Sequence, residues 1–319
     1  MRKTVLLYNA RSGRRQRNHR ENDLQTALKL LAGAGVQAAL VRTQSSQDAS
    51  EQASKAIAAG CDTVFACGGD GTVHDVLQGM VGSPAALAIL PMGTANALAH
   101  DLQLPRHPGL AVQAALAAVP RRVALGRIAA RALDGTPVSR FFTVAVGIGV
   151  DAHLFYKLNT STKQKLGMAA YYAKAWNLWF THRMERFQVE WSGGGNGPAA
   201  HSGVTELLAV RIRNFGGVLR ELAPGASLER NDLRLVICRS ASRLSYLHYV
   251  VRGLLGRSWQ VPGVELAHAE TVSCKYALED GGALLGTRVY VEADGELLGT
   301  LPAEITMVPD ALTLLVPKP

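Results

Sequence analysis

Residues 63–72 read Thr-Val-Phe-Ala-Cys-Gly-Gly-Asp-Gly-Thr, an apolar run that ends in three glycines around one carboxylate. The apolar residues that follow are spaced i, i+3, i+4 and i+7, which predicts a helix with one buried face: Val73, Val76, Leu77 and Met80. A strand, a glycine turn and a helix start present backbone N–H groups to an anion. We expect the three glycines to adopt positive φ and to let the backbone approach a phosphate. Simple packing is the alternative interpretation.

Strands and helices alternate on both sides of this turn. Besides the central strand, the predicted strands are residues 4–8, 36–41 and 85–90, and the predicted helices lie around 24–31, 49–58 and 110–119. This alternation over the first 120 residues favours a mainly parallel sheet covered on both faces. In such sheets ligands bind at the carboxyl ends of the strands. The loops that follow strands are therefore expected to form one phosphate site: 9–13, 43, 68–72 and 91–94.

After Arg121 the pattern changes to short β-like runs separated by glycine-rich turns. The predicted strands are residues 122–133, 141–148, 186–191, 204–213, 233–237 and 288–292, with two more short strands in the tail at 304–316. These runs predict an antiparallel sandwich. A helical insert at about 151–182 carries an aromatic stripe. The stripe either packs on the sandwich or contacts a lipid chain or an anionic membrane surface.

Length, composition and charge restrict the class of protein to which the chain can belong. A chain of 319 residues with 48% apolar residues can bury ample core in two domains. No run of 18 apolar residues occurs, so we expect neither a membrane span nor a secretory signal, and a cytoplasmic location. The net charge is +9, and seven Lys or Arg lie in residues 1–20, a basic arm that is either solvated or in contact with phosphate or anionic lipid. No nucleic-acid-binding signature accompanies it.

Two motifs resemble a known family. Gly68-Gly69-Asp70-Gly71-Thr72 resembles the signature of the superfamily that contains diacylglycerol, sphingosine and NAD kinases. Pro91–Ala99 is similar to a stretch of the bacterial lipid kinases with a diacylglycerol kinase catalytic domain. The resemblance covers the whole chain and implies a nucleotide-binding α/β domain at 1–121 and 305–319, with a β-sandwich lipid-substrate domain at 122–304. It implies transfer of the γ-phosphate of ATP, with Mg²⁺, to the hydroxyl of diacylglycerol or a related lipid.

The same resemblance implies which residues bind the nucleotide. Asn9-Ala10-Arg11-Ser12-Gly13 resembles the family's Asn-Pro-x-Ser-Gly loop, with Ala10 where proline is usual. Thr43 matches a threonine that the family places after the second strand. The remaining nucleotide-binding candidates are Gly68, Gly69, Asp70, Gly71, Thr72 and Thr94. We expect Thr94 to begin a helix. Asp70 is the expected magnesium-linked carboxylate, directly or through water.

Asp294-Gly295-Glu296 resembles the family's Asp-Gly-Glu, whose carboxylates are assigned the base and metal-network roles. Either Asp294 or Glu296 is expected to accept the proton of the lipid hydroxyl, while the other orients metal or substrate; Glu296 is the second candidate metal ligand, after Asp70. Two carboxylates two apart on a strand point the same way. Alternatively, Asp294-Gly295 is only a hairpin turn with solvated acids. Asp151, in a further motif at 147–152, either lies near the interdomain cleft or caps a helix.

The sequence departs from the family pattern at three places. Ala97 replaces an aspartate and removes one carboxylate from the expected Mg²⁺ network, and His74-Asp75 stands where Asn-Glu is common. Residues 222–233 resemble a structural-metal loop, but Arg230 occupies an aspartate ligand position. A guanidinium cannot bind a cation, so we predict that this structural metal is missing or built differently.

Two other functions remain open at the level of sequence. A nucleotide- or lipid-binding protein with lost or weak catalysis is favoured by Ala97 and Arg230. An NAD kinase-like enzyme shares the glycine motif, but the stretch at 91–99 argues against it.

Overall fold

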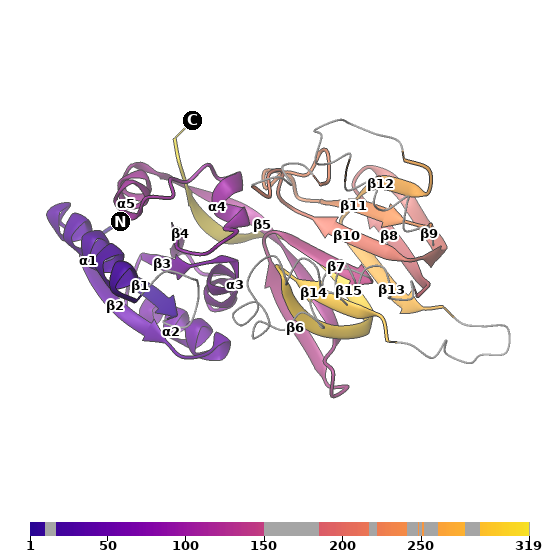
Figure 1. Ribbon diagram of the computed structural model, residues 1–319, viewed down its shortest axis with the longest axis horizontal. Coiled ribbons are helices and arrows are strands. Elements are labelled where there is room, and N and C mark those ends of the chain that lie inside the picture. The colour runs from indigo at the N-terminus through magenta and orange to yellow at the C-terminus, as the bar shows by residue number, and fades with distance from the viewer. Residues whose placement is uncertain are drawn as a thin grey trace. The chain divides into compact units, whose positions relative to one another are not determined.

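The computed structural model describes residues 1–9, 17–149, 185–216, 222–240, 248, 251, 261–277 and 288–318. It divides into two compact units, drawn as ribbons in Figure 1. Unit 1 comprises Met1–Leu125, Asn214–Leu219 and Val308–Pro319, and unit 2 comprises Gly126–Arg213 and Arg220–Met307. The expectations for Ala10–Gly13, for Asp151 and for the helical insert fall outside the described residues.

Unit 1 contains a parallel sheet in the strand order β2-β1-β3-β4. Its strands are β1 (Lys3–Asn9), β2 (Gln37–Thr43), β3 (Thr63–Gly68) and β4 (Ala86–Pro91). The last part of β15 (Glu296–Val316) adds a further parallel strand, with Thr313 opposite Ala86. Every residue of β3 and of β4 is buried, which is why both strands are apolar at nearly every position rather than alternating. The predicted parallel sheet is confirmed.

Helices cover this sheet (Figure 1). They are α1 (Arg17–Gly33), α2 (Ser46–Ala58), α3 (Asp70–Gln78), α4 (Ala97–Asp101) and α5 (Pro108–Ala117). Leu24 and Leu31 of α1 form one apolar core with Val112 of α5 and with Phe65 and Leu90 of the sheet. The start of α2 is fixed by Ser45, whose Oγ accepts the backbone N–H of Asp48 at 3.1 Å.

Several predicted boundaries in unit 1 are wrong. Thr94 does not begin a helix, because α4 starts at Ala97 and Thr94 is exposed in the preceding turn. Helix α5 ends at Ala117, and Pro120 lies inside β5 (Val119–Arg131). The tail forms one strand, β15, rather than two, although Pro302 and Pro309 favour a break. Asp310 takes a left-handed φ of 47° after the second proline, so the backbone adjusts locally and the strand continues.

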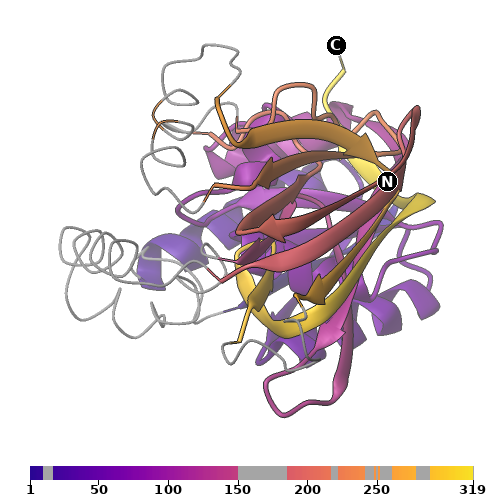
Figure 2. The same cartoon turned by 90° about the vertical axis from the view of Figure 1, so that its right-hand side faces the viewer.

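Unit 2 is an antiparallel sandwich, whose strands face the viewer in Figure 2. One sheet has the order β12-β11-β10-β7-β14-β15. Strand β15 also pairs with β13, β13 pairs with β8, and β8 pairs with β9. The strands are β6 (Pro137–Phe142), β7 (Ala145–Gly149), β8 (Phe187–Gly193), β9 (Asn196–Val204), β10 (Glu206–Val210), β11 (Leu233–Cys238), β12 (Val264–Ala269), β13 (Thr271–Tyr276) and β14 (Tyr290–Ala293). The predicted sandwich is confirmed, but the pattern did not reveal β9, β12 and β13.

The four cysteines are free, and Cys67, Cys238 and Cys274 are buried. Burial raises the pKa of the Cys67 and Cys274 thiols, so both stay protonated and unreactive at neutral pH. Among the described residues, no helix is both long enough and apolar enough to cross a membrane.

Candidate functional site

The strand ends of unit 1 meet at one edge of the parallel sheet. Asn9, the last residue of β1, lies opposite Thr43, the last residue of β2, and Gly68 lies opposite Pro91 in the same way. This register brings the described members of the predicted nucleotide site to one edge. Thr43 is buried, and its hydroxyl donates to the carbonyl of Tyr8 at 3.3 Å. The hydroxyl therefore also fixes the ends of β1 and β2 to each other.

Glycines at this edge allow two turns to touch. A Cβ on Gly93 would lie 2.4 Å from the Cα of Gly69, so the backbones of the two motifs are in direct contact. A Cβ on Gly68 would lie 2.2 Å from Oγ1 of Thr72, so the threonine folds back over the glycine. The prediction that the glycines adopt positive φ is wrong, because none of Gly68, Gly69 and Gly71 does so. Close approach, rather than a left-handed backbone, requires glycine here.

Asp70 joins the two turns. It is the first residue of α3, and its Oδ2 accepts the backbone N–H of Asn96 at 2.9 Å while its Oδ1 accepts that of Ala97 at 2.6 Å. A carboxylate at a helix N-terminus is also favoured by the helix dipole. Ala97 makes its contact through the backbone, so the replacement of the family's aspartate leaves this link intact.

Asn96 is a site residue that lies within the motif at 91–99 but was not predicted as one. It has a left-handed φ of 53° and is buried. Its Oδ1 accepts the N–H of Gly93, and its Nδ2 donates to the carbonyl of Gly93, both at 2.9 Å. Asparagine is among the few residues that tolerate this backbone region, which is the signal that could have identified it.

The contact between Gly69 and Gly93 predicts that Gly93→Ala weakens ATP binding. The added methyl group would also lie 2.7 Å from Oδ1 of Asn96, so both turns must move apart. Overpacking of this kind costs about 1–3 kcal/mol, and we expect ATP affinity to fall roughly 5- to 100-fold by calorimetry. Gly33→Ala is the matched control, since nothing lies within 4 Å of a Cβ there. Equal ATP affinity in the two variants would show that the turns do not need this contact.

In unit 2, Asp294 and Gly295 form the two-residue loop of a hairpin. Ala293 of β14 pairs with Glu296 of β15, and the two loop residues have φ values of 48° and 83°. Positive φ at both central positions is the preferred geometry of such hairpins. The premise that Asp294 and Glu296 share one strand is therefore wrong. Asp294 is buried, whereas Glu296 is exposed.

The carboxylate of Asp294 is bound to the segment between β6 and β7. Its Oδ1 accepts the backbone N–H groups of Val144 at 2.9 Å and Ala145 at 3.1 Å. Its Oδ2 accepts the backbone N–H of Thr143 at 3.0 Å and lies 3.4 Å from the hydroxyl of the same residue. Asp294 is thus not a solvated turn residue, and four donors converge on its two oxygens.

Glu292 is a second buried carboxylate of this hairpin, and sequence reasoning missed it. Its Oε2 accepts the backbone N–H of Gly295 at 2.8 Å. Gly147 of β7 leaves room for it, because a Cβ there would lie 2.8 Å from Oε1 of Glu292. Together Glu292 and Asp294 fix the loop that precedes Glu296.

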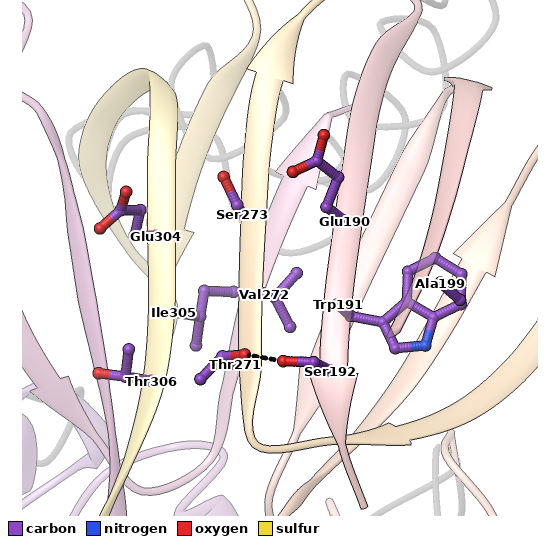
Figure 3. Close-up of a pocket in the computed structure, with 10 residues that line it drawn as sticks. All are labelled: Glu190, Trp191, Ser192, Ala199, Thr271, Val272, Ser273, Glu304, Ile305 and Thr306. Carbon is purple, nitrogen blue, oxygen red and sulfur yellow. Dashed lines mark hydrogen bonds between the residues drawn. The ribbon is translucent and has the colours of Figure 1, made fainter. Parts of the chain in front are cut away.

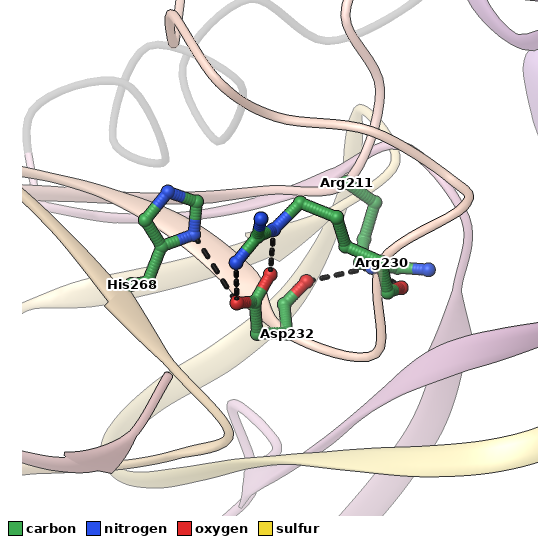
Figure 4. Close-up of polar contacts among 4 residues, drawn as sticks. All are labelled: Arg211, Arg230, Asp232 and His268. Carbon is green, nitrogen blue, oxygen red and sulfur yellow. Dashed lines mark hydrogen bonds and ion pairs between the residues drawn. The ribbon is translucent and has the colours of Figure 1, made fainter. Parts of the chain in front are cut away.

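The segment that resembles a structural-metal loop contains Arg230 and is contacted by Arg211 (Figure 4). The guanidinium of Arg230 donates to both carboxylate oxygens of Asp232, and Nδ1 of His268 lies 3.3 Å from one of them. Burial acts to raise the pKa of Asp232, but the hydrogen bond from Arg230 and the charges of His268 and Arg230 outweigh it and lower that pKa. Burial lowers the pKa of Arg211 to about 10, partly opposed by Asp232, so Arg211 is charged at neutral pH.

A cavity of about 450 Å³ lies on unit 2, on strands β8, β13 and β15 (Figure 3). Glu190, Ser273 and Glu304 occupy neighbouring positions on the three strands. The hydroxyls of Ser192 and Thr271 lie 2.6 Å apart. None of the residues predicted from the motifs lines this cavity.

Comparisons with known proteins cover nearly the whole chain. Residues 3–128 match the diacylglycerol kinase catalytic domain, and residues 144–316 match the YegS C-terminal NAD kinase beta sandwich-like domain. A diacylglycerol kinase of Bacillus subtilis is 25% identical over 321 residues, covering 100% of this chain and 97% of the relative. A diacylglycerol kinase of Staphylococcus epidermidis is 25% identical, and the match covers 98% of this chain and 92% of the relative.

Solved structures show the same fold. A diacylglycerol kinase from Bacillus anthracis has a TM-score of 0.68 at 17% identity, covering 99% of this chain and 96% of that chain. Yeast NADH kinase has a TM-score of 0.50 at 10% identity, covering 99% of this chain and 84% of that chain.

Proposed function

The chain belongs to the bacterial diacylglycerol kinase family and is a lipid kinase, and from that premise we propose that it transfers the γ-phosphate of ATP to the hydroxyl of diacylglycerol. The catalytic-domain match and the sandwich match together account for nearly all of the sequence. The choice of diacylglycerol as the acceptor rests most on the matched relatives. They are named diacylglycerol kinases and match this chain over nearly its full length.

The edge of the parallel sheet in unit 1 supports nucleotide binding. Backbone N–H groups at the start of α3, together with the ends of β1 and β2, are the groups that bind phosphate in such folds. Mg²⁺ usually keeps several waters and takes only one or two protein carboxylates in addition to substrate phosphates. Asp70 fits that requirement as a carboxylate at the first position of α3, beside the glycine turn. Bound Mg²⁺ would neutralise charge on the phosphates.

The two candidate acids of the hairpin take different roles in this proposal. Glu296 is exposed and is the proton acceptor for the lipid hydroxyl. Asp294 is a positioning residue, since its oxygens accept three backbone N–H groups of residues 143–145.

A diacylglycerol substrate resides in a membrane, so the enzyme works at a lipid surface, which we assign to the inner face of the membrane. The net charge of +9 suits contact with anionic lipid.

A transfer assay tests the proposed function. Purified protein is incubated with γ-labelled ATP and mixed micelles that contain diacylglycerol, a monoacylglycerol or a sphingoid base, and NAD⁺ in a separate arm. We expect labelled phosphatidic acid from the diacylglycerol arm, at least about 100-fold above an Asp70→Ala control. Label on NAD⁺ alone would indicate an NAD kinase instead. Tight ATP binding without label on any acceptor would indicate a binding protein that has lost catalysis, the function that Ala97 favours.

A further inference from the structure

Arg211 is a fully buried arginine that follows four apolar residues of a strand. It follows β10 directly and is 0% exposed. Its Nη1 donates to the carbonyls of Arg230 at 2.8 Å and Asp232 at 2.6 Å, and its Nη2 donates to that of Leu228 at 3.4 Å. Three carbonyls at alternate positions of one loop thus converge on a single cation.

Backbone carbonyls that converge in this way are ligands that hard divalent cations prefer. A guanidinium satisfies them differently, since it brings positive charge together with directional donors but no capacity to accept. A divalent ion at the same carbonyls would stand directly against the charge of Arg211. The residues present therefore do not fit the structural metal that the loop resemblance implies.

The carboxylate of the loop is also engaged. Arg230, in the position of a family ligand, donates to both oxygens of Asp232, as Figure 4 shows. His268 from β12 approaches the same carboxylate. In the described part of the chain, no group of three His, Cys, Asp or Glu side chains is arranged to hold a metal ion.

We propose that the guanidinium of Arg211 takes the place of the structural cation, so that the loop at 222–232 folds without a divalent metal. Arg211 satisfies the carbonyls that an ion would bind, and Arg230 neutralises the carboxylate that would complete its coordination. This inference concerns stability and does not depend on the proposed reaction.

Thermal unfolding without nucleotide tests the proposal. The wild-type Tm is expected to change by less than about 1 °C between excess EDTA and millimolar Mg²⁺, Ca²⁺ or Mn²⁺, because an ion stabilises a fold only by binding it. Arg211→Met leaves the three carbonyls without their donor, and we expect the Tm to fall by roughly 5–15 °C. Arg239→Met is the control, since that arginine is half exposed in a 3.8 Å ion pair with Glu265, and it should cost about 1–2 °C at most.

Two further variants test whether the loop can bind a divalent ion, even if Arg211→Met does not fold. Arg230→Asp restores a carboxylate ligand but keeps the guanidinium of Arg211, so it should gain no stabilisation from divalent ions. The double variant Arg211→Gly, Arg230→Asp removes the guanidinium as well and should show a Tm that rises with divalent-ion concentration. A wild-type Tm that falls by several degrees in EDTA would overturn the proposal. So would metal-dependent stabilisation of Arg230→Asp alone.

Discussion

Glu296→Gln is expected to lower kcat about 10²- to 10⁴-fold, the range that a positioned general base contributes. Glutamine has nearly the same shape as glutamate but cannot accept the proton of the lipid hydroxyl. Because Glu296 is exposed at the first position of β15, the substitution should leave the Tm within about 2 °C of wild type. Steady-state kinetics with diacylglycerol micelles and a calorimetric scan give both quantities.

Asp294→Asn is the matched comparison two residues away. Its one NH2 group replaces one carboxylate oxygen, so it opposes either the N–H of Thr143 or those of Val144 and Ala145. An opposed buried donor costs about 1–3 kcal/mol. The Tm should therefore fall together with kcat. The opposite result, with Glu296→Gln at more than half the wild-type kcat and Asp294→Asn inactive at an unchanged Tm, would move the base to Asp294. A higher Mg²⁺ requirement in Glu296→Gln would instead assign that residue to the metal network.

The fold was predicted most accurately where nearly every residue of an element is apolar. Strand β3 is apolar at nearly every position because helices cover both of its faces, so its extent and its parallel sheet could be predicted from the sequence. Strands β12 and β13 were missed because their core positions hold small residues, such as Ala267, Ala269 and Cys274, which give a weak alternating signal. The tail is one strand rather than the two predicted, because a strand accommodates proline where no backbone N–H is needed for pairing.

Motifs located the candidate site but not the contacts within it. Spacing alone places Asp294 and Glu296 on one face of a strand, whereas the left-handed turn at Asp294 buries one and exposes the other. Arg211 belongs to no motif, and its importance comes from carbonyls that lie 17 to 21 residues further along the chain. Contacts over such distances depend on the folded register, which a residue pattern does not contain.

Asp70→Asn is expected to reduce turnover at least about 100-fold, the loss that a displacement of about 1 Å at a reacting group produces. Each carboxylate oxygen of Asp70 accepts a backbone N–H, one from Asn96 and one from Ala97. An asparagine can accept only one of them, because its amide nitrogen then opposes the other N–H. The conflict costs about 1–3 kcal/mol and moves α4 away from the glycine turn, so the Tm should fall as well. Asp134→Asn, in an exposed turn, is a control for the loss of one carboxylate.

Affinity for ATP separates the two roles that Asp70 could have. If Asp70 acts by tying the turns together, Asp70→Asn should weaken ATP binding roughly 10-fold or more even in EDTA, since 1.4 kcal/mol corresponds to tenfold. If it acts only through Mg²⁺, the variant should bind ATP like wild type in EDTA and differ only when Mg²⁺ is present. The contacts to Asn96 and Ala97 predict the first result. Equal affinities in EDTA would contradict it, because the phosphate-binding turns would then keep their geometry without the carboxylate that joins them.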